Sequence, residues 1–166
     1  PMDFVIDGAG RCDITLTWQG KKTELPEFGL LFPLRRELTE VSYLGLGPRE
    51  TAADRTAGGK MGAWSYNVRQ DFARYTPVYP QECGGRTGVY RAALTGSIPG
   101  ICFAGDGMTF SVLPYTPHEL ENARHLYELP RDDNKTVVRC ALFQRGVGGD
   151  NSWGAKPHEN ACHAVE

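Results

Sequence analysis

A glycine-rich run near the C-terminus holds the residues best suited to chemistry. Residues 146–154 read GVGGDNSWG and follow directly on an expected strand. Gly148 and Gly149 permit left-handed backbone and tight reversals, and Asp150 and Ser152 can bond nearby backbone amides and stiffen the loop. The loop would then fix Trp153, whose negative ring face complements the axial hydrogens of a pyranose. The run predicts sugar binding by Trp153, although a tryptophan that caps the core at a strand end would explain it equally well.

Acidic pairs are the other groups that could act on a sugar. Glycoside hydrolysis needs an acid and a base or nucleophile held across the sugar ring. The pairs are expected in turns and on helix surfaces, where carboxylates are solvated: Glu37/Glu40, Glu119/Glu121 and Asp132/Asp133. His118 and His125 alone do not make a metal site. No phosphate-binding loop, dinucleotide fingerprint, zinc-protease motif or nucleophile elbow occurs. We therefore expect this chain to carry no catalytic residue, metal or cofactor.

The composition narrows the class of protein. The 166 residues are 40% hydrophobic and 23% charged, with a net charge of −2. These values indicate a globular chain and give no electrostatic case for nucleic acid or an anionic membrane surface. No apolar run is long enough to span a membrane, and the first residues resemble no signal peptide. Five cysteines without a Cys-x-x-Cys predict buried or half-buried free thiols, as in a reducing compartment. The sequence leaves the choice between cytoplasm and periplasm open.

The elements that must position these residues are mostly strands. Twenty glycines and eleven prolines punctuate short apolar stretches, as is typical of an all-β sandwich. Residues 11–18 alternate in polarity, which predicts a half-buried strand. One short helix is expected at 117–124, because Thr116 and Glu119 form a capping box around Pro117. Residues 48–88 carry few periodic signals and are expected to be irregular. Further strands are expected at 28–34, 40–46, 88–94, 101–104, 109–115 and 135–143.

Three ordered motifs resemble the C-terminal domain of the large β-galactosidases of glycoside hydrolase family 2, also called its small-chain or domain 5 type. The first is YLGLGPRE at 43–50 with Asp54-Arg55, the second is YTP at 75–77 with PQE at 80–82, and the third is GVGGDNSW at 146–153. The resemblance covers residues 25–159. The chain departs from the family at Ala52, where a tyrosine is usual, and at Cys83 and Gly85, where asparagines are common. The family domain also continues past the tryptophan loop, so its last strand is expected to be missing here.

The resemblance implies a fold and a division of labour. Residues 1–166 would form a single large antiparallel β-sandwich, a supersandwich related to galactose mutarotases, that packs on a (β/α)8 barrel. Such a barrel needs about 250 residues, so the catalytic carboxylates and any divalent metal would belong to the barrel of a larger, homo-oligomeric enzyme. That enzyme would hydrolyse terminal β-galactosides with retention. Trp153 would line the sugar site, supported by its loop, while Glu50 and Arg55 would tie the irregular segment together.

Two other functions fit the same residues. A free-standing carbohydrate-binding module would use Trp153 and Trp64 as stacking platforms. A mutarotase-like enzyme would need a histidine acid and a carboxylate base beside the sugar, and none of the four histidines lies in a matching motif. The leading prediction is therefore a non-catalytic domain cut from a β-galactosidase.

Overall fold

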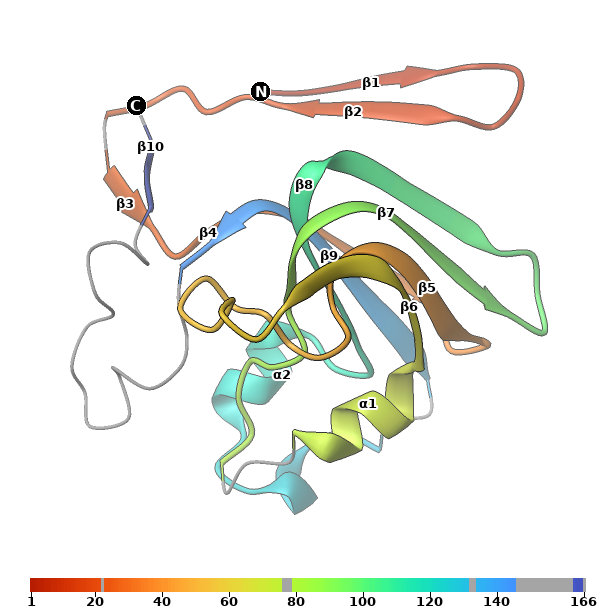
Figure 1. Cartoon of the computed structure of the whole chain (residues 1–166), viewed down its shortest axis with the longest axis vertical. Coiled ribbons are helices and arrows are strands. Elements are labelled where there is room, and N and C mark those ends of the chain that lie inside the picture. The colour runs from red at the N-terminus through yellow and green to blue at the C-terminus, as the bar shows by residue number, and fades with distance from the viewer. Residues whose placement is uncertain (22, 76–78, 132–133, 146–162, 166) are drawn as a thin grey trace.

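A six-stranded antiparallel sheet dominates the computed structural model, which describes residues 1–21, 23–75, 79–131, 134–145 and 163–165 (Figure 1). Its strand order is β4-β9-β8-β7-β5-β6. The strands are β4 (Glu27–Arg35), β5 (Leu38–Gly47), β6 (Lys60–Asn67), β7 (Arg86–Gly96), β8 (Ile101–Leu113) and β9 (Lys135–Gln144). Two smaller antiparallel pairs join β1 (Met2–Ile6) to β2 (Cys12–Leu16) and β3 (Thr23–Leu25) to β10 (His163–Val165). This architecture confirms the mainly β, antiparallel fold predicted from the sequence.

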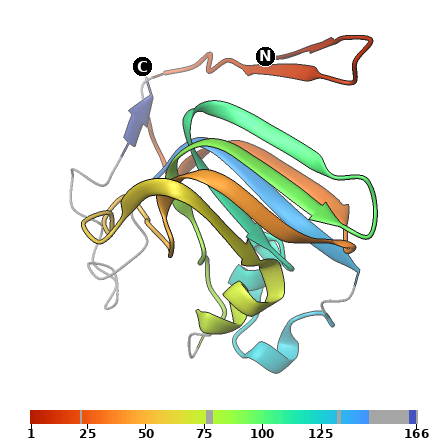
Figure 2. The same cartoon turned by 45° about the vertical axis from the view of Figure 1, so that its right-hand side comes forward.

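Buried and exposed side chains alternate along the middle of strand β5. Val41 and Tyr43 are buried, whereas Ser42 and Leu44, which alternate with them, are exposed. The period of two puts the buried residues on one face of the pleat. The sheet is strongly curved (Figures 1 and 2), and its other strands contribute the rest of the core. The largest apolar cluster there includes Leu38, Val89, Leu94, Phe110, Val112 and Val138.

Two α-helices and one 3-10 turn lie together at one end of the sheet: α1 (Val68–Arg74), α2 (Pro117–Asn122) and η1 (Leu126–Glu128). The capping box of α2 is present, since Thr116 Oγ1 accepts from the Glu119 amide at 3.2 Å and the Glu119 carboxylate accepts from the Thr116 amide at 2.8 Å. Leu120 is buried from this helix in a second apolar cluster with Cys83, Leu113 and Leu129. The helix predicted at 117–124 is confirmed, but it ends at Asn122, because Ala123 has an extended backbone.

The structure corrects three details of the sequence prediction. Residues 48–88 are not irregular throughout, because β6 and α1 lie within them. The strands expected at 101–104 and 109–115 form one strand, β8, whose register with β7 shifts around Gly107, where φ is 70°. Of the four described thiols, Cys83 and Cys140 are buried or half-buried as expected, but Cys12 and Cys102 are exposed. Within the described ranges, no helix is long and apolar enough to cross a membrane.

Candidate functional site

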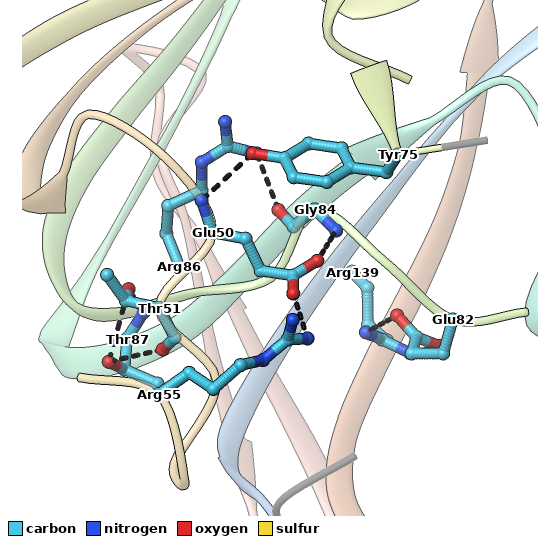
Figure 3. A network of polar contacts seen from close by, with 9 residues as sticks. All are labelled: Glu50, Thr51, Arg55, Tyr75, Glu82, Gly84, Arg86, Thr87 and Arg139. Atoms are coloured by element: carbon cyan, nitrogen blue, oxygen red, sulfur yellow. Dashed lines mark hydrogen bonds and ion pairs between the residues drawn. The ribbon is translucent and has the colours of Figure 1, made fainter. Parts of the chain in front are cut away.

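Glu50 is the centre of a polar network formed by two of the motif segments (Figure 3). Its backbone amide donates to Tyr75 Oη at 3.0 Å, and its carboxylate accepts from the Gly84 amide at 2.5 Å. The same carboxylate forms an ion pair with Arg55. Charge-assisted bonds of this kind fix geometry more firmly than neutral ones. The prediction that a carboxylate and Arg55 tie the irregular segment together is confirmed.

Arg86 secures the same segment from inside the protein. Its side chain is 1% exposed, and its guanidinium donates to Gly84 O at 2.6 Å and lies 2.7 Å from the Asp71 carboxylate. The guanidinium also sits over the ring of Tyr66, 4.2 Å from the centroid. Burial opposes the charge, but Tyr66 and Asp71 outweigh it and raise the pKa of Arg86. Gly84 has φ of 71°, a conformation that favours glycine, so its backbone can serve both Glu50 and Arg86.

Thr51 and Thr87 form a third tie between the irregular segment and β7. The Thr51 amide donates to Gly85 O at 2.8 Å, and Thr51 Oγ1 accepts from the Thr87 amide at 3.0 Å. Thr87 Oγ1 returns a bond to Thr51 O at 2.8 Å. These bonds satisfy backbone groups that a strand ladder would otherwise satisfy.

Arg139, in the middle of β9, joins this strand to two other parts of the chain. It is nearly buried, makes a two-pronged ion pair with Glu82, and places Nε 3.1 Å from Glu27 Oε1. Burial raises the pKa of Glu27 despite the opposing effect of Arg139. Glu27 pairs in register with Gln144, and the Arg145 amide donates to Pro26 O at 2.9 Å. The end of β9 at Gln144 is therefore paired with the start of β4, and the next residue, Arg145, is bonded to Pro26 just before β4.

The predicted sugar-binding residues follow directly after that point. Trp153 and its supporting residues Gly148, Gly149, Asp150 and Ser152 lie outside the described residues. Their role remains a prediction. What the described residues establish is the anchored strand end from which this run starts.

Trp64, the second tryptophan considered as a stacking platform for sugar, makes contacts within the protein itself. Its Nε1 donates to Gly45 O at 3.2 Å, and its ring packs against the main apolar cluster. Gly47 makes room for it, since a Cβ at this position would lie 2.6 Å from Trp64 Cδ1. The half-buried ring therefore has a structural role.

Among the described residues, the acidic side chains named from the sequence serve as surface or capping groups. Glu37 pairs with Arg35 on the surface, and Glu40 accepts from Asn67. Glu119 caps α2 and pairs with Lys135, while Asp132 and Asp133 lie outside the described residues. Within the part of the chain that the structure describes, no group of three or more histidine, cysteine, aspartate or glutamate side chains could hold a metal ion.

The sequence did not predict three charged residues that take part in these contacts: Asp71, Arg86 and Arg139. Each is a charged residue that is nearly buried. For Arg139 a signal was available, because it interrupts the apolar run TVVRCALF of a predicted strand. A charge inside such a run must find a partner, since burying it unpaired is costly.

Comparisons with known proteins point to one family. A family model described as "Beta galactosidase small chain" matches residues 1–165. A β-galactosidase of Lactobacillus delbrueckii subsp. bulgaricus is 38% identical over 163 residues, which are 96% of this chain and 16% of that protein. A β-galactosidase of Priestia megaterium is 37% identical, over 93% of this chain and 15% of its own length. A β-galactosidase small subunit of Latilactobacillus sakei is 34% identical, and the match covers 93% of this chain and 52% of the subunit.

Proposed function

Because the chain belongs to the β-galactosidase small chain family, we propose that it is a non-catalytic part of a β-galactosidase and works together with a catalytic partner segment. One observation carries the proposal: the match to the L. sakei protein covers 93% of this chain, and that protein is itself a β-galactosidase small subunit. The chain spans only 16% of the length of a relative such as the L. delbrueckii enzyme. A catalytic barrel of about 250 residues does not fit into this chain, so the hydrolytic carboxylates would come from the partner.

We propose further that Trp153 contributes the face on which the sugar stacks. In this scheme the partner's two carboxylates hydrolyse a terminal β-galactoside with retention. Trp153 takes part in no proton transfer and only positions the ring, which lowers the entropic cost of reaching the transition state. The anchoring of residues 144–145 by Pro26 and Glu27 supports this role, because a stacking residue needs a fixed point of attachment.

A chimeric enzyme tests the proposal. The region of the L. delbrueckii β-galactosidase that matches this chain is replaced by residues 1–166, and hydrolysis of a nitrophenyl-β-galactoside is measured. We expect the chimera to be active, a deletion of the same region to be inactive, and the isolated chain to give no turnover above the blank. A correctly folded chimera that is no more active than the deletion would refute the proposal, as would turnover by the isolated chain.

Sugar binding separates this function from that of a free-standing carbohydrate-binding module. If most of the sugar site belongs to the catalytic partner, galactose should bind the isolated chain weakly or not at all. Titration calorimetry measures this directly. Tight binding of galactose by the isolated chain would favour the module.

A further inference from the structure

The end of β9 depends on side chains for its position. The described ladder with β8 stops at Ala141, whereas the ladder with β4 continues to Gln144. Beyond Ala141 the described backbone pairing therefore holds the strand from one edge. A strand end with fewer backbone partners opens more readily, so contacts between side chains are needed to fix it.

Arg139 supplies one set of these contacts. Its side chain is 6% exposed, makes the two-pronged ion pair with Glu82, and places Nε 3.1 Å from Glu27 Oε1. Glu27 is also the residue of β4 that pairs with Gln144. We call Glu27, Glu82 and Arg139 the ion cluster. Its contacts therefore act directly on the residue that pairs with the last position of β9.

The segment that precedes β7 lies against the same strand end. A Cβ added to Gly85 would lie 3.4 Å from Gln144 Oε1. The Gly84 amide donates to the Glu50 carboxylate at 2.5 Å, and Figure 3 shows Glu82 and its ion pair beside this network. Glu50 belongs to the first sequence motif and Glu82 to the second. The first two motifs therefore meet at the point from which the chain continues into the third.

We propose that the three residues of the ion cluster are positioning residues for the sugar site, because they fix the strand end to which the Trp153 run is joined. This rests on the proposed function, since it assumes that Trp153 stacks on the sugar. The ion cluster touches no substrate in this scheme and takes part in no proton transfer. It acts through Trp153, because a stacking residue on a fixed base loses less freedom when the sugar binds.

The charges of the ion cluster allow a test in folded protein. Two carboxylates share one guanidinium, so the loss of either negative charge leaves Arg139 with one ionised partner. Glu82→Gln removes the carboxylate of the two-pronged pair and keeps an amide oxygen as an acceptor. Glu27 remains 3.1 Å from Arg139 Nε. We therefore expect Glu82→Gln to fold and to hold the strand end less firmly, since charge-assisted pairs are stronger than neutral ones.

A double-mutant cycle in the L. delbrueckii chimera tests whether Glu82 acts through Trp153. The Michaelis constant for a nitrophenyl-β-galactoside is measured for Glu82→Gln, for Trp153→Ala and for the two changes together. We expect Glu82→Gln alone to raise it by about threefold to tenfold, with kcat unchanged. In the Trp153→Ala background Glu82→Gln should have no further effect, because no ring is left to position.

Glu119→Gln is the matched control, because it also removes an ion pair to β9. Its partner is Lys135, the first residue of the strand, at the end away from Gln144. We expect the Michaelis constant to stay unchanged in both backgrounds. Glu27→Gln is the second variant of the ion cluster and should reproduce the effect of Glu82→Gln, so the cycle can be completed even where one of the two variants fails to fold.

The outcomes of the cycle separate the two proposals. If Trp153→Ala raises the Michaelis constant but Glu82→Gln does not, the positioning role is overturned and the proposed function stands. The same holds if Glu82→Gln raises it by an equal factor in both backgrounds, because Glu82 would then act independently of Trp153. No effect of Trp153→Ala would overturn the proposed role of the tryptophan and the positioning role together.

Amide hydrogen exchange measures the fixing of the strand end without requiring activity. The Arg145 amide donates to Pro26 O at 2.9 Å. Followed by mass spectrometry in the chimera, exchange over residues 142–145 should be at least about fivefold faster in Glu82→Gln than in Glu119→Gln. Equal exchange in both variants and the parent chimera would show that the ion cluster does not fix this end and would overturn the inference.

Discussion

The buried ion pair between Arg86 and Asp71 yields a stability prediction that the structure specifies closely. Asp71→Asn keeps the shape of the side chain and removes its charge. The Arg86 guanidinium then remains in the interior, where its side chain is 1% exposed, without the carboxylate that lies 2.7 Å away. Burying an uncompensated charge is among the most costly changes in a folded protein.

The magnitude follows from the surroundings of Arg86. Removing one partner of a buried pair costs about 3–5 kcal/mol. Gly84 O at 2.6 Å and the Tyr66 ring at 4.2 Å remain in place and still interact favourably with the cation. The introduced asparagine side chain also keeps one amide oxygen as an acceptor. We therefore expect a loss near the lower end of the range, about 3 kcal/mol.

Urea unfolding followed by circular dichroism measures this loss, provided that the slope of the transition is unchanged. The control is Glu37→Gln, which removes the surface ion pair with Arg35 and should leave the midpoint where it was. The double variant Arg86→Met/Asp71→Leu should recover most of the stability, because well-packed apolar residues often replace a buried ion pair without loss. A cost below about 1 kcal/mol for Asp71→Asn would refute the assignment of this pair as a buried, mutually compensating one.

Three further predictions concern packing, acid stability and thiol reactivity. Gly47→Ala should destabilise the fold by about 1–3 kcal/mol through overpacking, because the new Cβ would meet the ring of Trp64. The control Gly58→Ala places a Cβ where no atom lies within 4 Å, so it should leave the stability unchanged in the same urea titration. Burial opposes ionisation of Glu119, but the bonds from Lys135 and Thr116 prevail and lower its pKa. The ionised carboxylate therefore stabilises the fold above pH 4.5, and this stabilisation is lost as the pH falls through the pKa of Glu119 in the folded state. On acidification the parent should lose more stability than Glu119→Gln, and equal losses would contradict this. Burial raises the pKa of Cys83 to about 12, so iodoacetamide near neutral pH should modify the exposed Cys12 and spare Cys83, and comparable modification of both thiols would show that Cys83 is accessible.

Local patterns predicted the elements whose signals lie within a few residues. The apolar run at 40–46, which includes Val41 and Tyr43, predicted β5, and Thr116 with Glu119 predicted the start of α2. Helix α1 was missed although it had a comparable signal, since the Asn67 side chain accepts from the Arg69 and Gln70 amides. The helix has only two turns, so its apolar residues repeat too few times to show a helical period in the sequence.

The candidate site was less predictable because its contacts join distant segments. The pairing of Glu50 with Arg55 could be inferred, since the two residues lie five apart. The partners of Arg139, Glu27 and Glu82, could not be inferred, because they depend on the strand order that sets β4 beside β9. A sequence shows that a charge is embedded in an apolar strand, but only the register shows which carboxylate reaches it.

The Michaelis constant of the Trp153→Ala chimera tests the central claim most directly. The claim is that this chain lends a stacking residue to a sugar site whose catalytic groups belong to its partner. Loss of an aromatic stacking contact of about 1–1.5 kcal/mol corresponds to roughly a tenfold weaker affinity. We predict a Michaelis constant raised by about that factor, with the melting temperature unchanged. Unchanged kinetics, or a loss of folding in place of a loss of affinity, would contradict the account and favour the alternative in which Trp153 caps the core.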